Sequence, residues 1–190
     1  MKMASLVATI VLGAGILAVS AYAQDAMKKE PPIKPADPPS KAVLAQWNDI
    51  GRKLIAMAED FPEDKYDMKP TPAQRSFEEQ LLHAAGATYY FTNVLTGQKL
   101  PDGDPKPDQY KTRADLVAFV KKSFADGAAA IQAKGDKGMA QLVVDPFEHK
   151  KTRVEDFAYA FIEHSGEHYG QLVVYYRLAG LVPPESRPKK

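Results

Sequence analysis

Two histidines, His164 and His168, lie four residues apart inside the last long segment with helical periodicity. In an α-helix such residues are about 5–6 Å apart on one face, so the two imidazoles could bind one metal ion. The same face, within an arc of roughly 80°, carries apolar residues that we expect in the core: Phe157, Phe161, Leu172 and Tyr175. A third histidine, His83, lies in the middle of an earlier helical segment. Three of the chain's four histidines thus occupy predicted inward positions, which is its strongest functional signal.

Buried imidazoles need partners for both ring nitrogens, because an unsatisfied polar group costs roughly 1–3 kcal/mol. His164 and His168 cannot each be the other's only partner. A metal ion would satisfy one nitrogen of each ring, while the second could donate to a carbonyl, a carboxylate or water. We therefore predict a metal site formed by His83, His164 and His168. Three imidazoles without a thiolate suit zinc, nickel or another first-row divalent ion, and they leave a position open for water or substrate.

The remaining histidines have plainer interpretations. His83, taken alone, could be a histidine at the edge of the core that is bonded to Glu79. Against this, Gly86 and Ala87 follow one turn later and predict open volume beside the ring, as a ligand pocket requires. His149 lies in a polar stretch ahead of the last helical segment, and we expect it to be a solvated loop residue.

A competing motif runs through residues 164–168, which match the H-x-x-E-H pattern of inverted zincins. That peptidase mechanism needs a further acidic ligand downstream, and only Glu185 follows, in a proline-flanked tail. We therefore do not favour a peptidase. Glu167, inside the motif, is our candidate for the acid–base group of the site, although a solvated helix glutamate is the more ordinary reading.

The first residues resemble a secretory signal peptide, which we predict over residues 1–23. One lysine precedes the apolar run Leu6–Val19, and Ala21-Tyr22-Ala23 fits an A-x-A cleavage site. The alternative is an uncleaved membrane anchor, but the run is short for the roughly 20 residues that span a bilayer. We expect an exported protein, either periplasmic or secreted.

The charge of the mature chain argues against some partners. Cleavage after residue 23 removes one lysine and no acidic residue, so 25 basic and 24 acidic residues become 24 of each. A neutral surface of mixed charge offers no field for nucleic acid or, after cleavage, for an anionic membrane. The chain contains no cysteine, so any metal site must use nitrogen and oxygen ligands.

Residues 24–39 are polar and rich in proline, and we read them as an extended linker before a domain over residues 40–190. That domain contains four segments of helical periodicity: Ser40–Asp60, Gln74–Thr96, Thr112–Lys134 and Thr152–Ala179. The predicted helix starts are marked by capping residues: Ser40, a capping box of Ser76 with Glu79, Thr112 with Asp115, and Thr152 with Glu155. The predicted ends are marked by glycines: Gly97, Gly135 and Gly180.

All fifteen prolines fall outside these four segments, which supports the assignment. Gln141–Val144 could be a short extended piece, but a single strand has no partner. The sequence therefore predicts an all-α four-helix bundle. The connections at 97–111 and 135–151 are long enough for crossovers, so the order of the helices stays open.

At these residues the chain resembles the DinB/YfiT superfamily of metalloenzymes. The resemblance is carried by Arg75–His83, by His164–Leu172 with its H-x-G-Q ending, and by Tyr176–Ser186, and it spans about Ser40 to Ser186. It implies a four-helix bundle with crossover topology, a divalent metal bound by His83, His164 and His168, and frequent dimerisation. Characterised relatives include transferases and isomerases that use low-molecular-weight thiols. Such thiols are scarce outside the cytoplasm, so for an exported chain we carry over the fold and the ligands only.

These observations favour an exported metal-dependent enzyme, a hydrolase or transferase of unknown small-molecule substrate, which could form a homodimer. We expect its open coordination positions to face a pocket lined by residues such as Trp47, Tyr90 and Phe161. The alternative is a non-catalytic bundle that binds a metal or a small molecule. A third reading is a metal-free helical interaction module.

Overall fold

The computed structural model describes residues 33–188 of the chain. The predicted signal peptide and most of the predicted linker lie outside the described residues. Residues 37–190 form one compact unit. No helix within the described part is both long and apolar enough to cross a membrane.

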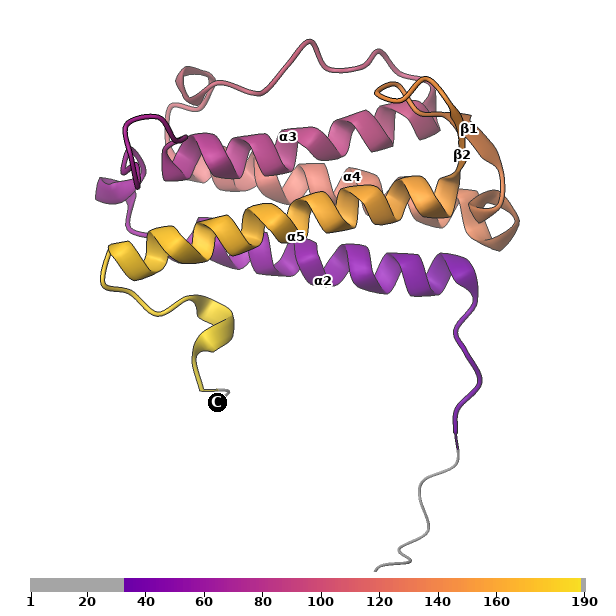
Figure 1. Cartoon of the computed structure of the whole chain (residues 1–190), viewed down its shortest axis with the longest axis horizontal. Coiled ribbons are helices and arrows are strands. Elements are labelled where there is room, and N and C mark those ends of the chain that lie inside the picture. The colour runs from indigo at the N-terminus through magenta and orange to yellow at the C-terminus, as the bar shows by residue number, and fades with distance from the viewer. Residues whose placement is uncertain (1–32, 189–190) are drawn as a thin grey trace, which may run out of the picture. The chain divides into compact units, whose positions relative to one another are not determined.

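Four α-helices make up this unit, as predicted (Figure 1). They are α2 (Pro39–Asp60), α3 (Phe77–Thr96), α4 (Arg113–Met139) and α5 (Val154–Leu178). Short 3₁₀ turns follow α2, precede α4 and follow α5: η1 (Glu63–Lys65), η2 (Pro107–Gln109) and η3 (Pro184–Ser186).

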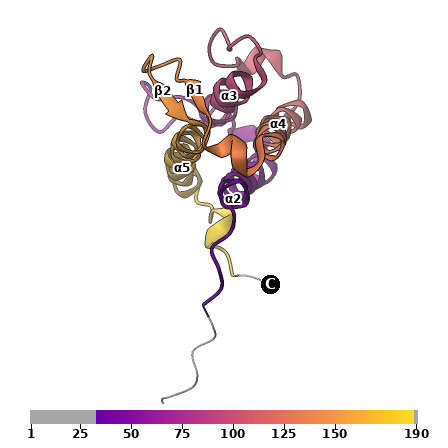
Figure 2. The same ribbon diagram turned by 90° about the vertical axis from the view of Figure 1, so that its right-hand side faces the viewer.

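The helix order is that of a crossover bundle. Helix α2 packs on α4 and α5, and α3 packs on the same two helices. Seen end-on, α2 lies diagonally opposite α3, and α4 lies opposite α5 (Figure 2). The loop after α3 returns along the length of the bundle before α4 starts, so α3 and α4 run in the same direction (Figure 1). The predicted crossover is therefore confirmed for residues 97–111, and it places α3 beside α5.

The capping predictions for α3 and α4 are confirmed. The Ser76 hydroxyl accepts from the backbone N–H of Glu79 while the Glu79 carboxylate accepts from the N–H of Ser76, so the helix begins at Phe77 and not at Gln74. Thr112 and Asp115 form the same reciprocal pair at the start of α4. These caps fix where α3 begins and hence which of its residues face α5.

Two other predicted starts are wrong. Helix α2 begins at Pro39, inside the predicted linker. Proline is tolerated in the first turn because the backbone N–H groups of that turn have no partner within the helix. Ser40 consequently does not cap α2; its hydroxyl contacts Asp136 instead, with an Oγ–Oδ1 distance of 2.5 Å. Helix α5 begins at Val154, and Thr152 precedes it in a strand.

That strand corrects the expectation that the extended piece near Gln141 has no partner. Strand β1 (Leu142–Val144) pairs in antiparallel fashion with β2 (Lys151–Arg153), with Val143 opposite Thr152. The turn of this hairpin brings residues 145–150 to the end of the bundle where α5 starts (Figure 1). Gly135 interrupts α4 as predicted, with φ 57° and ψ −176°, but a further turn continues to Met139.

Candidate metal site

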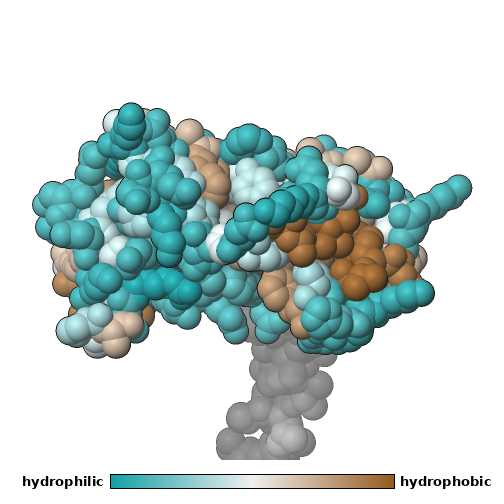
Figure 3. Space-filling view, turned by 90° about the horizontal axis from the view of Figure 1, so that it is seen from above, coloured by the Kyte–Doolittle hydropathy of each residue, from teal (hydrophilic) through white to brown (hydrophobic). Residues whose placement is uncertain are grey.

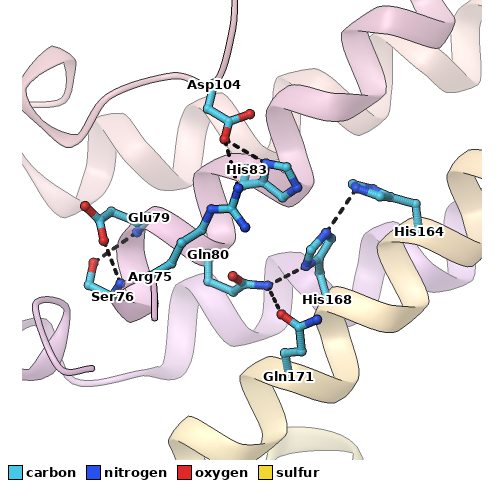
Figure 4. A network of polar contacts seen from close by, with 9 residues as sticks. All are labelled: Arg75, Ser76, Glu79, Gln80, His83, Asp104, His164, His168 and Gln171. Atoms are coloured by element: carbon cyan, nitrogen blue, oxygen red, sulfur yellow. Dashed lines mark hydrogen bonds and ion pairs between the residues drawn. The ribbon is translucent and has the colours of Figure 1, made fainter. Parts of the chain in front are cut away.

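The three predicted histidines come together in the space between α3 and α5 (Figure 4). His83, His164 and His168 each present a ring nitrogen, and these nitrogens all lie within 4.8 Å of one another. The ring centroid of His83 lies 5.2 Å from that of His164 and 4.6 Å from that of His168. The antiparallel packing of α3 on α5 therefore produces the convergence that the sequence predicted.

His168 is the most buried of the three, at 7% exposure, and both of its nitrogens have neighbours. Its Nε2 lies 3.0 Å from Nε2 of His164, so two imidazole nitrogens face each other. Its Nδ1 contacts the side-chain amide of Gln80, which donates to Oε1 of Gln171 at 2.5 Å. Gln80 and Gln171 thus hold the inner side of the His168 ring, and only Nε2 faces the other histidines.

His83 is held from the loop between α3 and α4. Its Nδ1 lies 2.8 Å from Oδ2 of Asp104, and Arg75 approaches the same carboxylate oxygen at 3.3 Å. A carboxylate accepts at that contact, so Nδ1 of His83 carries a proton, and in the neutral form of the ring Nε2 keeps its lone pair. The predicted alternative, a bond to Glu79, is wrong because the Glu79 carboxylate is engaged by the helix cap and Lys69.

The same loop corrects a second expectation. Gly86 does not leave open volume beside His83, because a Cβ atom there would meet Cδ of Pro105 at 2.5 Å. Pro105 therefore packs directly on the backbone of α3. This close approach holds the loop that carries Asp104 against the histidine, so Gly86 serves the placement of Asp104.

The environment keeps the histidines of α5 neutral. Burial, followed by the neighbouring His164 and His83, lowers the pKa of His168 to about 4. Burial and then the charge of His83 lower the pKa of His164 as well, while Glu167 acts weakly in the opposite direction. At neutral pH both rings are therefore uncharged, which is the form that ligates metals.

The residues present fit a metal ion. The Nε2 atoms of His164 and His168 face each other at 3.0 Å, and the ring of His83 lies beside them. The three rings therefore offer nitrogen donors to one shared position. Within the described residues, Nδ1 of His164 is buried without a protein partner. The carboxylate behind His83 is the usual outer support of a metal-binding histidine. A single ion takes one nitrogen from each ring, so an ion held between the facing nitrogens leaves Nδ1 of His164 to a second partner such as water.

A pocket of about 440 Å³ opens beside His83 and His164. Its other lining residues come from α3, the loop after it, the hairpin turn and α5: Ala87, Tyr90, Asp104, Asp145, Phe147, Glu148, Phe157, Ala160 and Phe161. Tyr90 and Phe161 line this pocket as predicted. Trp47 does not; it is 1% exposed in the core, and its indole N–H donates to the carbonyl of Phe124 at 2.9 Å.

Two further residues singled out in the sequence lie away from the ring nitrogens. Glu167 is exposed on α5 and does not line the pocket, and across residues 33–188 it takes part in no hydrogen bond or ion pair. Its acid–base role stays a prediction. His149 is exposed in the hairpin turn, as predicted, with a φ of 52°, and does not join the histidine cluster.

Sequence reasoning missed four supporting residues. Gln80 and Asp104 contact His168 and His83 directly, while Gln171 and Arg75 contact those two in turn. Gln171 had a signal, because it ends the H-x-G-Q pattern one turn after His168. Asp104 had none, because nothing in a long proline-rich loop indicates which acidic residue folds back on the helix.

Comparison with known proteins places this geometry in a family. A profile of the DinB superfamily matches residues 46–172. A DinB-like protein from Bacillus cereus has a similar structure, with 18% identity and a TM-score of 0.64 over 76% of this chain and 95% of its own. A DinB-like protein from Bacillus subtilis gives 22% identity and a TM-score of 0.61 over 78% and 99%.

YfiT from Bacillus subtilis is also similar, with 14% identity and a TM-score of 0.57 over 80% of this chain and 94% of its own. It is described as a probable metal-dependent hydrolase with an unusual four-helix bundle topology. No curated protein sequence matches. At these identities the solved structures establish the shared bundle, and the profile covers more than half of the chain. The protein is therefore a member of the DinB superfamily.

Proposed function

We propose that this protein is an exported metal-dependent enzyme, a hydrolase or a transferase, that binds a divalent ion through His83, His164 and His168. One observation carries the proposal: three imidazoles converge between α3 and α5 at the edge of a pocket, and two of them turn ring nitrogens toward each other at 3.0 Å. The description of YfiT as a probable metal-dependent hydrolase supports the same class.

The donor set favours zinc or nickel among the divalent ions, because imidazole nitrogen suits both and no thiolate is present. When bound, such an ion supplies Lewis-acid polarisation of a substrate oxygen or lowers the pKa of bound water. Three protein ligands leave a coordination position for that water or for the substrate. The pocket beside His83 and His164 is where a substrate would reach it.

The supporting residues have assignable tasks in this proposal. Asp104 accepts from Nδ1 of His83 and thereby keeps Nε2 of that ring available. Gln80 can do the same for His168, because its amide oxygen and nitrogen exchange places by a half rotation and the oxygen can then accept from Nδ1. Gln171 would follow by turning its own amide. With both amides turned in this way, each contact fixes a tautomer in which the nitrogen facing the cluster carries no proton.

Glu167 is the proposed acid–base group of the site. Glu167 lies next to His168 in sequence, and its charge acts on His164. We propose it as the group that exchanges a proton with the substrate. Replacement by glutamine tests this role, because Glu167→Gln keeps the size of the side chain and removes its basicity.

Export, the substrate and the assembly state are also proposed. The signal-like residues 1–23 support cleavage and a periplasmic or secreted location. The small volume of the pocket supports a small-molecule substrate, and the balanced charge of the mature chain argues against nucleic acid and membrane surfaces as partners. A homodimer is proposed from the resemblance to the family alone.

The test is metal-dependent turnover in mature protein without a histidine tag. Protein stripped with chelator and reconstituted with zinc or nickel is assayed against small esters, amides and phosphate esters, and in group transfer to thiols. His168→Ala removes a proposed ligand, and His149→Asn is the matched control, because asparagine tolerates the positive φ at that exposed position.

We expect turnover in the reconstituted wild type and in His149→Asn, and none in His168→Ala or in stripped protein. Turnover that survives both stripping and His168→Ala would exclude catalysis at this site. A bound ion without turnover on any substrate would instead favour the non-catalytic binding bundle.

A further inference from the structure

The pocket beside the histidines has two chemically different ends. His83 and His164 form one end, and the hairpin turn between β1 and β2 forms the other through Asp145, Phe147 and Glu148. The turn lies at residues 145–150, immediately before the strand that leads into α5. A bound molecule would therefore bridge the histidine cluster and the hairpin.

Aromatic rings form the wall between these ends. Phe147 contacts Tyr90 with ring centroids 5.1 Å apart, and it lies 6.5 Å from Phe161. Phe161 in turn packs edge-on against Phe157 at 5.1 Å and reaches His164 at 6.4 Å. Phe147 is 59% exposed although it is a large apolar side chain. Hydrophobic surface gathers toward the hairpin end of this face (Figure 3). Such a wall fits the apolar body of a ligand.

The charges of the pocket have one sign. Its lining includes Asp104, Asp145 and Glu148 but neither lysine nor arginine. Arg75 lies 3.3 Å from Asp104, and Lys150 pairs with Glu148. Asp145 differs from both, because no lysine or arginine of residues 33–188 lies within ion-pair distance of it, and the charge of Lys150 acts on it only at longer range. A cationic group on a ligand would supply that missing partner.

Asp145 is also held in place. Its Oδ1 accepts from the backbone N–H of Phe147 at 2.8 Å and of Glu148 at 3.1 Å. These bonds fix the carboxylate in the turn and leave its second oxygen for another donor. The rings of Phe147 and Tyr90 line the same pocket as Asp145, and aromatic faces attract cations.

We propose that the pocket takes small amphipathic amines: molecules with an aromatic or aliphatic body and one protonated amino group. The ammonium lies at Asp145, the apolar body lies along Phe147, Phe157 and Phe161, and the opposite end of the molecule points to the histidines. This deepens the proposed function by naming its substrate class, and it places the reacting group at the end away from the amine. Anionic molecules of the same shape are disfavoured at the hairpin end.

The test compares three ligands that share one body. They are 4-phenylbutylamine, the neutral 4-phenylbutan-1-ol and the anionic 5-phenylpentanoate. Binding to chelator-stripped protein is followed by calorimetry or by chemical-shift changes at neutral pH and low salt. Stripped protein is used first because a bound cation would attract the carboxylate. We expect the amine to bind at least about tenfold more tightly than the carboxylate, with the alcohol between them.

Two variants locate the effect. Asp145→Asn keeps an oxygen for the two backbone N–H groups of the turn but removes the charge, and we expect it to weaken amine binding by roughly three- to fivefold while leaving the alcohol unchanged. Asp64→Asn removes one exposed charge outside the pocket lining and should change neither ligand. A thermal melt of each variant confirms that it is folded.

Equal or tighter binding of the carboxylate overturns the proposal, as does absence of binding by all three ligands at millimolar concentration. A full amine preference in Asp145→Asn overturns the assignment to Asp145. Metal content is measured separately on unstripped protein. Amine selectivity without any metal would refute the proposed metalloenzyme but keep this inference, and a stoichiometric metal without amine selectivity would do the reverse.

Discussion

Helices α3 and α5 meet in two regions that differ in whether their buried polar atoms have hydrogen-bond partners within the chain. Near the start of α3, Phe77 stacks on Phe61 with ring centroids 3.8 Å apart, and Tyr176 from the end of α5 packs edge-on against Phe61 at 4.9 Å. We call these three residues the aromatic stack; each is 0% exposed. Less than two turns further along α3, the histidine cluster occupies the same interface.

The aromatic stack is complete within the chain. The Tyr176 hydroxyl donates to the carbonyl of Met57 at 3.2 Å, and that of neighbouring Tyr66 donates to the carbonyl of Ala58 at 2.6 Å. The histidine cluster instead leaves Nδ1 of His164 buried without a protein partner and turns two imidazole nitrogens toward each other. The contrast teaches that one region of the interface satisfies its polar atoms within the chain, whereas the other leaves imidazole nitrogens free to bind something from outside it.

The largest expected effect is on the stability of the aromatic stack. Phe77→Ala should lower the free energy of unfolding by about 3–5 kcal/mol, because it leaves a cavity among fully buried rings. Chemical denaturation of metal-free protein measures it. Metal bound per folded chain should stay unchanged, and a loss of metal in folded Phe77→Ala would mean that the two regions are not separate.

Acid should destabilise the metal-free protein through the histidine cluster. The folded pKa of His168, about 4, lies below the ordinary value near 6.5, so the unfolded chain binds protons that the folded chain does not. The stabilisation is complete above about pH 6.5 and is lost as the pH falls toward 4. For each such histidine the loss is at most about 1.4 kcal/mol per pH unit.

Denaturation of stripped protein at pH 7.5, 6 and 5 measures this loss. His168→Gln has no titrating group at that position and should show a shallower dependence, while the aromatic stack is untouched. Identical pH profiles for the wild type and this variant would remove His168 as the cause.

Asp104→Asn should affect the metal site by a smaller amount. Asparagine can still accept from Nδ1 of His83 but lacks the charge that increases the basicity of the ring, so we expect metal affinity to fall by roughly 10- to 100-fold. Competition with a chelator of known affinity measures it. An unchanged affinity would show that Asp104 only positions the loop.

Ser76→Ala is expected to have the smallest effect. It removes the capping hydroxyl next to Phe77 and should lower stability by about 1 kcal/mol. Metal affinity should change little, because His83 lies in the second turn of α3, beyond the turn that Ser76 caps. Thermal or chemical denaturation, with the chelator competition as control, checks both halves of this expectation.

The sequence predicted most of what depends on local pattern. The periodicity of the four helices, the capping boxes at Ser76 and Thr112, and the shared face of His164 and His168 all follow from residues close together in the chain. The convergence of His83 with the other two was also expected, because buried imidazole nitrogens need partners and a shared metal ion would supply one for each ring. The hairpin was missed because its strands are three residues each, too short for a periodicity signal.

What could not be predicted depends on contacts between distant segments. Asp104 reaches His83 through a loop whose path is set by the packing of Pro105 on Gly86. Nothing in the sequence around Gly86 or Pro105 indicates that the two are in contact. Trp47 was placed in the pocket because it is large and apolar, yet it fills the core beside Gly127, where a Cβ atom would lie 2.0 Å from its ring. Burial of an aromatic residue alone does not distinguish a pocket wall from a core.

Elemental analysis of mature, untagged protein tests the central claim most directly, with His83→Ala, His164→Ala and His168→Ala measured beside the wild type and His149→Asn. The account predicts about one zinc or nickel ion per chain in the wild type and in His149→Asn, and a large loss in each of the three alanine variants. Metal-free wild-type protein that also fails to take up zinc or nickel on dialysis, or equal metal in all five proteins, would contradict it.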